Sequence, residues 1–293
     1  MTASLPARAM LYMLVAVALF ALMDAGLKLL SPHYPALQVA MLRGASALPL
    51  VLAWALLGAA AGSLVRVHWP LHLLRGALGI AMMFGFVYGL RTLPLSTAYA
   101  ITFVSPLLVT AMAGPLLGEK IGPRRWIAIA IGLVGVLVVL RPTGAGMLTL
   151  GGLAVLLATL CWAASAITVR LLAQRDSTQA MVLWFMAILA LGAGALSFHE
   201  WRPIRTEHIW VIAGIGVTGT LAQIALTEAF RRGEASLIAP LEYTALVWGV
   251  MLDVALWGVL PDGVTWFGAA IIVASGLYLL RREKAQAVAV PPP

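Results

Sequence analysis

Long apolar runs follow one another along the 293-residue chain, separated by short segments that hold charged residues, proline or glycine. A helix needs about 20 mostly apolar residues to cross the hydrocarbon core of a bilayer. The pattern predicts ten such helices, over residues 10–30, 36–58, 76–91, 97–117, 126–141, 150–172, 179–198, 209–230, 237–260 and 264–281. We therefore expect an all-α polytopic membrane protein with ten transmembrane helices.

Composition agrees with a membrane protein and excludes a soluble one. Hydrophobic residues make up 62% of the chain and charged residues 10%, whereas soluble domains carry about 25% charged residues. The connections between predicted helices are short, so we expect no soluble domain among them. The single cysteine, Cys161, excludes an intrachain disulfide. Residues 282–293 are of low complexity, and we expect a disordered cytoplasmic tail there.

The distribution of lysine and arginine predicts the orientation, because cytoplasmic segments of membrane proteins carry an excess of both. With the N-terminus in the cytoplasm, thirteen of the 19 basic residues, Arg75 among them, fall in inner segments. The outer segments hold four, namely Arg91, Arg141, Arg202 and Arg205. We expect a bacterial-type inner-membrane protein with both termini in the cytoplasm. The net charge of +8 reflects this bias, so we expect a lipid bilayer and no nucleic acid as partner.

The two halves of the chain match when one is shifted along the other by 140 residues. RTLPLSTAYAITFVSPLL (91–108) then lies over RRGEASLIAPLEYTALVW (231–248), and Gly118 lies over Gly258. Apolar sequences match easily by chance, so each identity alone is a weak signal. Their order over a whole half indicates an internal duplication.

Nearer the start of each half the shift is 142 residues, which places Phe20 over Trp162. We predict two repeats, at residues 9–141 and 148–281, with five helices each. Because five is odd, the second repeat must enter the bilayer from the opposite face. Inverted repeats of this kind are a hallmark of secondary transporters, whose solute site lies near the membrane midplane.

Three charged residues lie within the first two predicted helices. Such charges cost about 2.5–3.5 kcal/mol each on insertion scales, which makes them functional candidates. Lys28 lies near a predicted boundary, where its long side chain can reach the interface. Asp24 and Arg43 lie at similar depth in an antiparallel hairpin, so we expect them to pair, with Lys28 completing a network. The network either holds the two helices together or lines the cavity and meets a charged or zwitterionic solute.

Other side chains within the predicted helices are candidates for contacting a solute. Aromatic and thioether groups offer flat or adaptable apolar surfaces. Glu242 follows Pro240, whose missing N–H bends a helix and frees a carbonyl. Ordinary helix packing is the alternative for each candidate. The predicted substrate-binding residues are Met82, Phe86, Tyr99, Ser105, Trp162, Gln223, Glu242 and Tyr243.

The sequence lacks the usual signatures of an enzyme. No HExxH, GxSxG or P-loop pattern is present, and we expect no metal or cofactor. All five histidines fall in predicted loops or at interfaces. His68 and His72 have the spacing of a helical metal site, but Pro70 lies between them, so we expect an interfacial loop there.

The chain resembles the drug/metabolite transporter superfamily, in its EamA-type branch of two five-helix repeats. The resemblance covers about residues 10–281. The segments that carry it are ALFALMDAGLKLL, the arginine of AMLRGAS, YGLRTLPLSTAYAITFVSPLLVTAMAGPLLGEKI, LCWAASAITVRLL and GEASLIAPLEYTALVWGVML. In its methionine- and aromatic-rich helices it is similar to the bacterial aromatic amino acid exporters.

The resemblance implies export of amino acids, related metabolites or drugs without ATP. We predict an inner-membrane exporter of amino acids, with apolar and aromatic ones preferred, that works by alternating access around a central cavity. A drug or other small-metabolite exporter is one alternative, and a membrane scaffold or sensor that moves no solute is another. Uniport and proton exchange both stay open, as does the oligomeric state.

Overall fold

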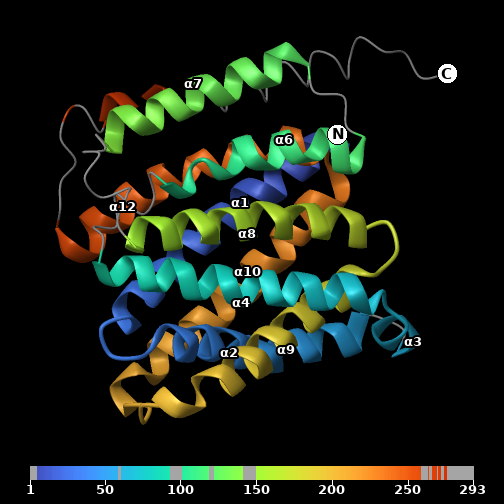
Figure 1. The fold of residues 1–293 in the computed structure, drawn as a ribbon, viewed down its shortest axis with the longest axis vertical. Coiled ribbons are helices and arrows are strands. Elements are labelled where there is room, and N and C mark those ends of the chain that lie inside the picture. The colour runs from blue at the N-terminus through green and yellow to red at the C-terminus, as the bar shows by residue number, and fades with distance from the viewer. Residues whose placement is uncertain are drawn as a thin grey trace.

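The computed structural model describes residues 5–58, 61–92, 101–118, 122–140 and 150–258, and beyond these residues 263, 266–268, 270–271 and 274–275. The elements in these ranges are helices, as predicted (Figure 1). In chain order they are α1 (Leu5–Leu30), α2 (Ala36–Gly58), α3 (Ala61–Val65), α4 (Trp69–Thr92), α6 (Ser105–Leu117), α7 (Pro123–Leu140), α8 (Leu150–Leu172), α9 (Thr178–Ser197), η1 (Phe198–Glu200), η2 (Thr206–His208), α10 (Ile209–Arg232), α11 (Ala235–Ile238), η3 (Ala239–Thr244) and α12 (Ala245–Trp257).

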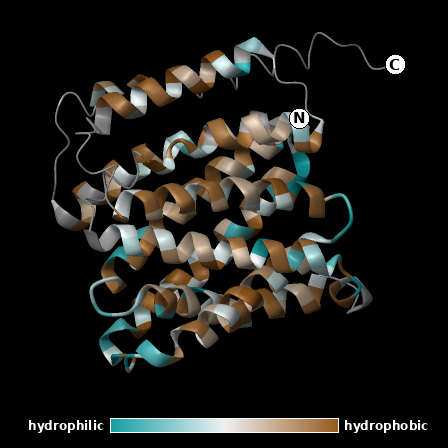
Figure 2. Ribbon diagram, in the orientation of Figure 1, coloured by the Kyte–Doolittle hydropathy of each residue, from teal (hydrophilic) through white to brown (hydrophobic). Residues whose placement is uncertain are grey.

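Seven helices in the described ranges are long and apolar enough to cross a membrane. They run over Ala7–Leu30, Ala36–Gly58, Trp69–Gly89, Leu150–Leu172, Thr178–Glu200, Thr206–Arg232 and Ala239–Leu256. Two shorter apolar helices, Leu107–Leu117 and Arg125–Gly135, overlap further predicted spans, and the span predicted at 264–281 lies largely outside the described residues. Hydrophobic residues follow the helices, while hydrophilic ones gather at helix ends and connections (Figure 2). The chain is a multi-pass helical membrane protein, and the count of ten spans stays a prediction.

The third long helix begins earlier than predicted. α4 starts at Trp69 and not at residue 76, and Pro70 is compatible with this start because the first helical turn needs no backbone N–H donor. His72 and Arg75, which we expected in an interfacial loop and an inner segment, are therefore helical and each 1% exposed. His72 Nε2 lies 2.9 Å from Asp176 Oδ2. The loop predicted at His72 is wrong, since a buried acid beyond the end of α8 supplies the partner that a loop would have found in water.

The main contacts between the halves join α1 with α10, α4 with α8, and α2 with α9. If the halves exchanged places, α1 would take the position of α8 and α4 that of α10. This exchange converts the α1–α10 pair into the α8–α4 pair and the α4–α8 pair into the α10–α1 pair. The α2–α9 pair is converted into itself. Figure 1 shows α4 beside α8 in the middle of the bundle and α2 beside α9. This is the contact pattern that a two-fold relation between two copies produces.

Small residues allow these helix pairs to approach closely. A Cβ atom added at Gly44 of α2 would lie 2.7 Å from the backbone nitrogen of Ala190 in α9. A Cβ atom at Gly85 of α4 would lie 2.6 Å from the carbonyl oxygen of Ala154 in α8. Close backbone approach of this kind replaces hydrophobic burial as a source of helix association in lipid.

Two repeat-related glycines end equivalent helices. Gly118 follows α6 with φ of 68°, and Gly258 follows α12 with φ of 65°. Their backbone N–H groups donate to Gly114 and Val254, respectively, one turn earlier. Left-handed φ at a helix end is open to glycine but strained for residues with a Cβ. The duplicated sequence therefore uses the same device to stop both helices.

We expect Gly118→Ala and Gly258→Ala each to lower the free energy of unfolding by about 1–2 kcal/mol, because alanine is strained at positive φ. Gly249→Ala is the matched control. An added Cβ meets no heavy atom within 4 Å at any of the three positions, but Gly249 lies inside α12. The control should leave stability unchanged or raise it, since alanine favours a helix. Thermal unfolding of the purified protein in detergent measures the differences, and equal shifts for all three variants would contradict the argument.

Candidate functional site

A central cavity lies among helices of both halves and has a volume of about 180 Å³. Helices α1, α2 and α4 of the first half contribute to its wall, together with α8 and the η3–α12 segment of the second. The lining is mostly apolar, with two acidic groups and one basic group. Its residues are Val17, Phe20, Ala21, Met23, Asp24, Arg43, Met82, Met83, Phe86, Thr102, Phe103, Ser105, Ala158, Thr159, Trp162, Glu242 and Ala245.

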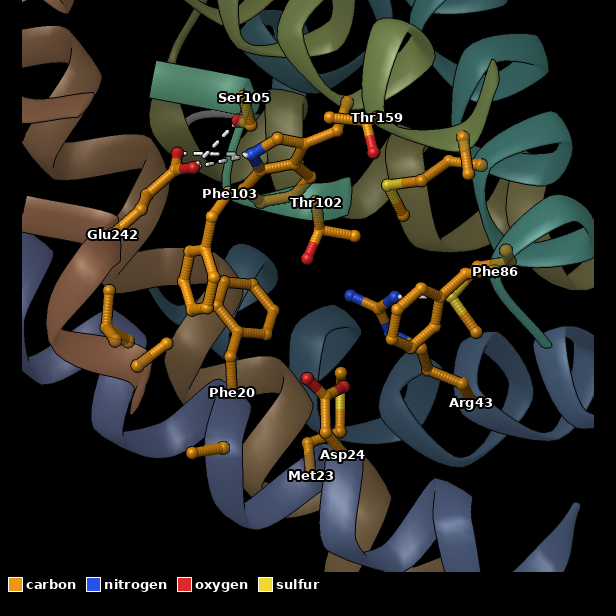
Figure 3. Close-up of a pocket in the computed structure, with 17 residues that line it drawn as sticks. Phe20, Met23, Asp24, Arg43, Phe86, Thr102, Phe103, Ser105, Thr159 and Glu242 are labelled. Carbon is orange, nitrogen blue, oxygen red and sulfur yellow. Dashed lines mark hydrogen bonds between the residues drawn. The ribbon is translucent and has the colours of Figure 1, made fainter. Parts of the chain in front are cut away.

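The carboxylate of Glu242 connects three parts of the chain at one corner of the cavity (Figure 3). Ser105 Oγ donates to Glu242 Oε2 at 2.8 Å. Trp162 Nε1 lies 3.1 Å from each carboxylate oxygen and donates to them. The hydroxyl comes from the first half and the indole from the second, so the acid bridges the two.

A break in the helical stretch between Ala235 and Trp257 directs Glu242 into the cavity. The short helix α11 ends at Ile238, and the chain continues as the 3-10 turn η3 before α12 begins at Ala245. Pro240 lies in the first turn of η3, where its missing N–H and fixed φ are tolerated. Broken helices at membrane depth occur where the irregular backbone lines a cavity or is buried in protein.

Asp24 of α1 and Arg43 of α2 face the same cavity, and Figure 3 shows them apart from the Glu242 corner. Arg43 is 2% exposed, and its Nη1 lies 3.0 Å from Met83 Sδ. Its guanidinium carbon lies 5.7 Å from the ring centroid of Phe20. Within the described chain, Arg43 Nε has no hydrogen-bond partner. The cavity therefore holds a cation with unused donor capacity.

The pairing expected between Asp24 and Arg43 takes a looser form. The two charges attract each other electrostatically, but no ion pair within 4.0 Å joins them. Lys28, the third member of the expected network, does not line the cavity. Asp24 and Arg43 thus stand as separate charges that both face the cavity space.

Aromatic rings form the apolar part of the wall. Phe20 and Trp162, which the internal repeat aligns, pack edge to face with ring centroids 6.1 Å apart. Phe103 and Tyr243, aligned by the shift of 140 residues, lie 5.8 Å apart. Repeat-related residues therefore meet where the halves face each other.

Five of the eight predicted substrate-binding residues lie in the cavity wall, namely Met82, Phe86, Ser105, Trp162 and Glu242. Gln223 lies at a smaller neighbouring pocket instead. Tyr243 is 2% exposed and packs with Phe103 and Ile129, so it does not line the cavity. Tyr99 lies outside the described residues. Solute binding by these residues stays a prediction.

Phe20 and Thr102 also line the cavity, although neither was among the predicted site residues. The internal repeat could have identified both residues. Phe20 aligns with Trp162 and Thr102 with Glu242, and all four line the cavity. For these two pairs, the predicted residue in the second half could have been used to propose its counterpart in the first.

The arrangement suits binding of a solute, since the cavity combines aromatic surface with separate positive and negative groups. The described part of the chain holds no cluster of three or more His, Cys, Asp or Glu side chains that could hold a metal ion.

Comparison with known proteins agrees with this geometry. The EamA-like transporter family matches residues 7–141 and again residues 149–281. A riboflavin transporter of Vibrio cholerae is 28% identical over 282 residues, covering 95% of this chain and 94% of that protein. The pseudopaline exporter CntI of Pseudomonas aeruginosa is 28% identical over 268 residues, covering 90% of this chain and 93% of that protein.

A solved crystal structure shares the fold. It superposes with a TM-score of 0.79 at 21% sequence identity, covering 94% of this chain and 98% of the other. At this identity the likeness concerns the fold alone.

These relatives are small-molecule transporters and not enzymes. The family matches both halves of the chain in turn, and the described helices include seven able to cross a bilayer. The protein is a multi-pass membrane transporter of small molecules, and it belongs to the EamA-like transporter family.

Proposed function

We propose that this transporter exports amino acids, with apolar and aromatic ones preferred, together with related metabolites. The observation that carries the proposal is the composition of the central cavity. It combines a buried arginine with unused donor capacity, two carboxylates, and a wall of aromatic and thioether groups. An amino acid presents the complementary set, with a carboxylate, an ammonium group and a side chain.

The charged groups give a bound amino acid a defined orientation. Arg43 binds the solute carboxylate, because a guanidinium presents several fixed donors that match a carboxylate. Asp24, which lies near Arg43 without pairing directly, accepts from the solute ammonium. The looser arrangement of these two charges leaves room for a zwitterion between them. Glu242 and Ser105 offer a second polar contact at the far corner of the cavity.

The solute side chain packs on the aromatic wall. Phe20, Phe86 and Trp162 supply flat apolar faces, and Met82 adapts to side chains of different shape. A volume of about 180 Å³ lies below the roughly 300–1,000 Å³ of drug-sized sites. The wall therefore favours an apolar or aromatic side chain, and the volume favours a solute smaller than a drug-sized molecule.

Alternating access accounts for movement across the membrane. We propose two inverted five-helix repeats at residues 9–141 and 148–281, in a bacterial inner membrane with both termini in the cytoplasm. The exchange-related helix contacts and the excess of lysine and arginine in the proposed inner segments support this arrangement. Rocking of one half against the other then opens the cavity to each side in turn.

A second candidate function is export of another small metabolite. The relatives named as riboflavin transporter and pseudopaline exporter support this alternative. The aromatic wall would suit a flat heterocycle as well as an aromatic side chain. A scaffold or sensor that moves no solute is less well supported, because the relatives of this chain are named as transporters.

We expect liposomes that contain the purified protein to transport L-phenylalanine and L-tryptophan. Glycine should move about tenfold more slowly at low concentration, because it lacks the side chain whose burial contributes about 1.5–3 kcal/mol. Uptake of radiolabelled solutes against protein-free liposomes measures this. Flux of riboflavin without flux of any amino acid would favour the second candidate function, and the absence of flux for every amino acid tested would contradict the proposed export of amino acids.

We expect Arg43→Gln and Asp24→Asn each to raise the KM for L-phenylalanine by about tenfold or more, since each removes a charge-assisted contact to the solute. Arg205→Gln and Glu207→Gln are matched controls, because these side chains form an exposed ion pair with 59% and 61% exposure. Initial rates in liposomes and thermal unfolding are measured together. Lower stability with an unchanged KM would show that the charges only hold α1 and α2 together.

A further inference from the structure

A second, much smaller pocket of about 10 Å³ lies next to the central cavity, between α4, α8, α9 and α10. In the present conformation it has room for about one water molecule. It is displaced toward the beginning of α4 and the end of α8, where Arg75 and Ser165 contribute to its wall. Trp162 and Met82 line both spaces and therefore stand between them. Gln223 of α10 completes the polar lining.

Arg75 is a buried cation that the protein does not neutralise within the described residues. Its side chain is 1% exposed, and no carboxylate lies within ion-pair distance of it in the described chain. Nη1 donates to the carbonyl oxygen of Met181 at 2.9 Å, and the guanidinium carbon lies 4.6 Å from the ring centroid of Phe185. The Nε atom is buried without a hydrogen-bond partner in the part of the chain that the structure describes. An uncompensated buried charge of this kind is expensive.

A comparison within the chain sets Arg75 apart from an arginine with a structural role. Arg170 lies at the end of α8 and donates to the carbonyl oxygens of Phe230 and Arg231 at 3.0 and 3.1 Å. Those contacts satisfy the unpaired carbonyls at the end of α10. Arg75 instead keeps a donor unused beside a pocket, and stacking on Phe185 fixes the plane in which its remaining donors point.

We propose that this pocket widens into a second station on the solute path when the Trp162 ring moves, and that Arg75 there binds the anionic group of the solute. The ligand class is a small organic carboxylate, with the Gln223 amide as a further donor and Trp162 and Met82 in contact with its apolar part. The inference rests on the proposed transport function, since it assigns a second site to the same path. Trp162 is held by Glu242 in the present conformation, so release of that bond frees the ring that separates the two stations.

Two probes of the same shape test the site. Phenylacetamide is neutral, and phenylacetate is anionic. Arg43 of the central cavity also attracts anions, so the measurement uses the full-length Arg43→Gln protein in detergent. Isothermal titration calorimetry should show tighter binding of phenylacetate than of phenylacetamide. Adding Arg75→Gln should weaken phenylacetate binding by about tenfold or more and remove the preference, while adding Arg75→Lys should keep part of it.

Arg170→Gln in the same background is the control for a loss of structure, since it removes a partly buried arginine away from the pocket. It should leave the preference for phenylacetate unchanged. An anion preference that survives Arg75→Gln, or that is absent before Arg75 is changed, overturns the assignment. The liposome assay separates this result from the proposed function. Arg75-dependent binding without amino acid flux refutes the transport proposal and keeps the pocket, whereas flux without Arg75-dependent binding does the reverse.

Discussion

A carboxylate placed among apolar helices must find hydrogen-bond donors, because an unsatisfied polar group in hydrocarbon costs several kcal/mol. Glu242 meets this constraint with the hydroxyl of Ser105 and the indole N–H of Trp162. One donor comes from each half of the chain. The single carboxylate of Glu242 therefore links the broken helix around Pro240 to both halves. The shape of the cavity follows, since the 3-10 turn, the indole and the hydroxyl are held in fixed relation around it.

The duplication supplies a scaffold, and differences between its copies supply the chemistry. Helix contacts keep the exchange relation, with α1 on α10 and α4 on α8. The lining does not keep it, because Thr102 stands where the second half has Glu242, and Ala166 stands where the first half has Asp24. Each half therefore carries its own acid at a different corner. A symmetrical bundle thereby encloses a cavity whose charge is distributed unevenly.

The sequence predicted the long apolar helices well, because a continuous run of hydrophobic residues has one stable arrangement in lipid. It placed the beginning of α4 too late, since His72 and Arg75 interrupt the apolar pattern and local reasoning assigns such residues to loops. Their burial depends on Asp176 and Phe185, which lie about a hundred residues later in the sequence. The direction in which the Tyr243 side chain points could not be predicted from the sequence either. The apolar pattern indicated an α-helix, whereas a 3-10 turn rotates successive side chains by a different angle.

The length of α4 has a consequence for the surrounding lipid. Its apolar span, Trp69–Gly89, has 21 residues and extends about 32 Å at 1.5 Å per residue, close to the hydrocarbon thickness of about 30 Å. In a thinner bilayer such a span responds by tilting or by thickening the adjacent lipid, at a modest cost for each ångström of mismatch. Because the first turns of α4 hold Arg75 and His72, the thickness of the host membrane bears directly on how deeply these groups sit. The chain length of the lipids can therefore change the depth of Arg75 and His72 in the membrane, independently of any bound solute.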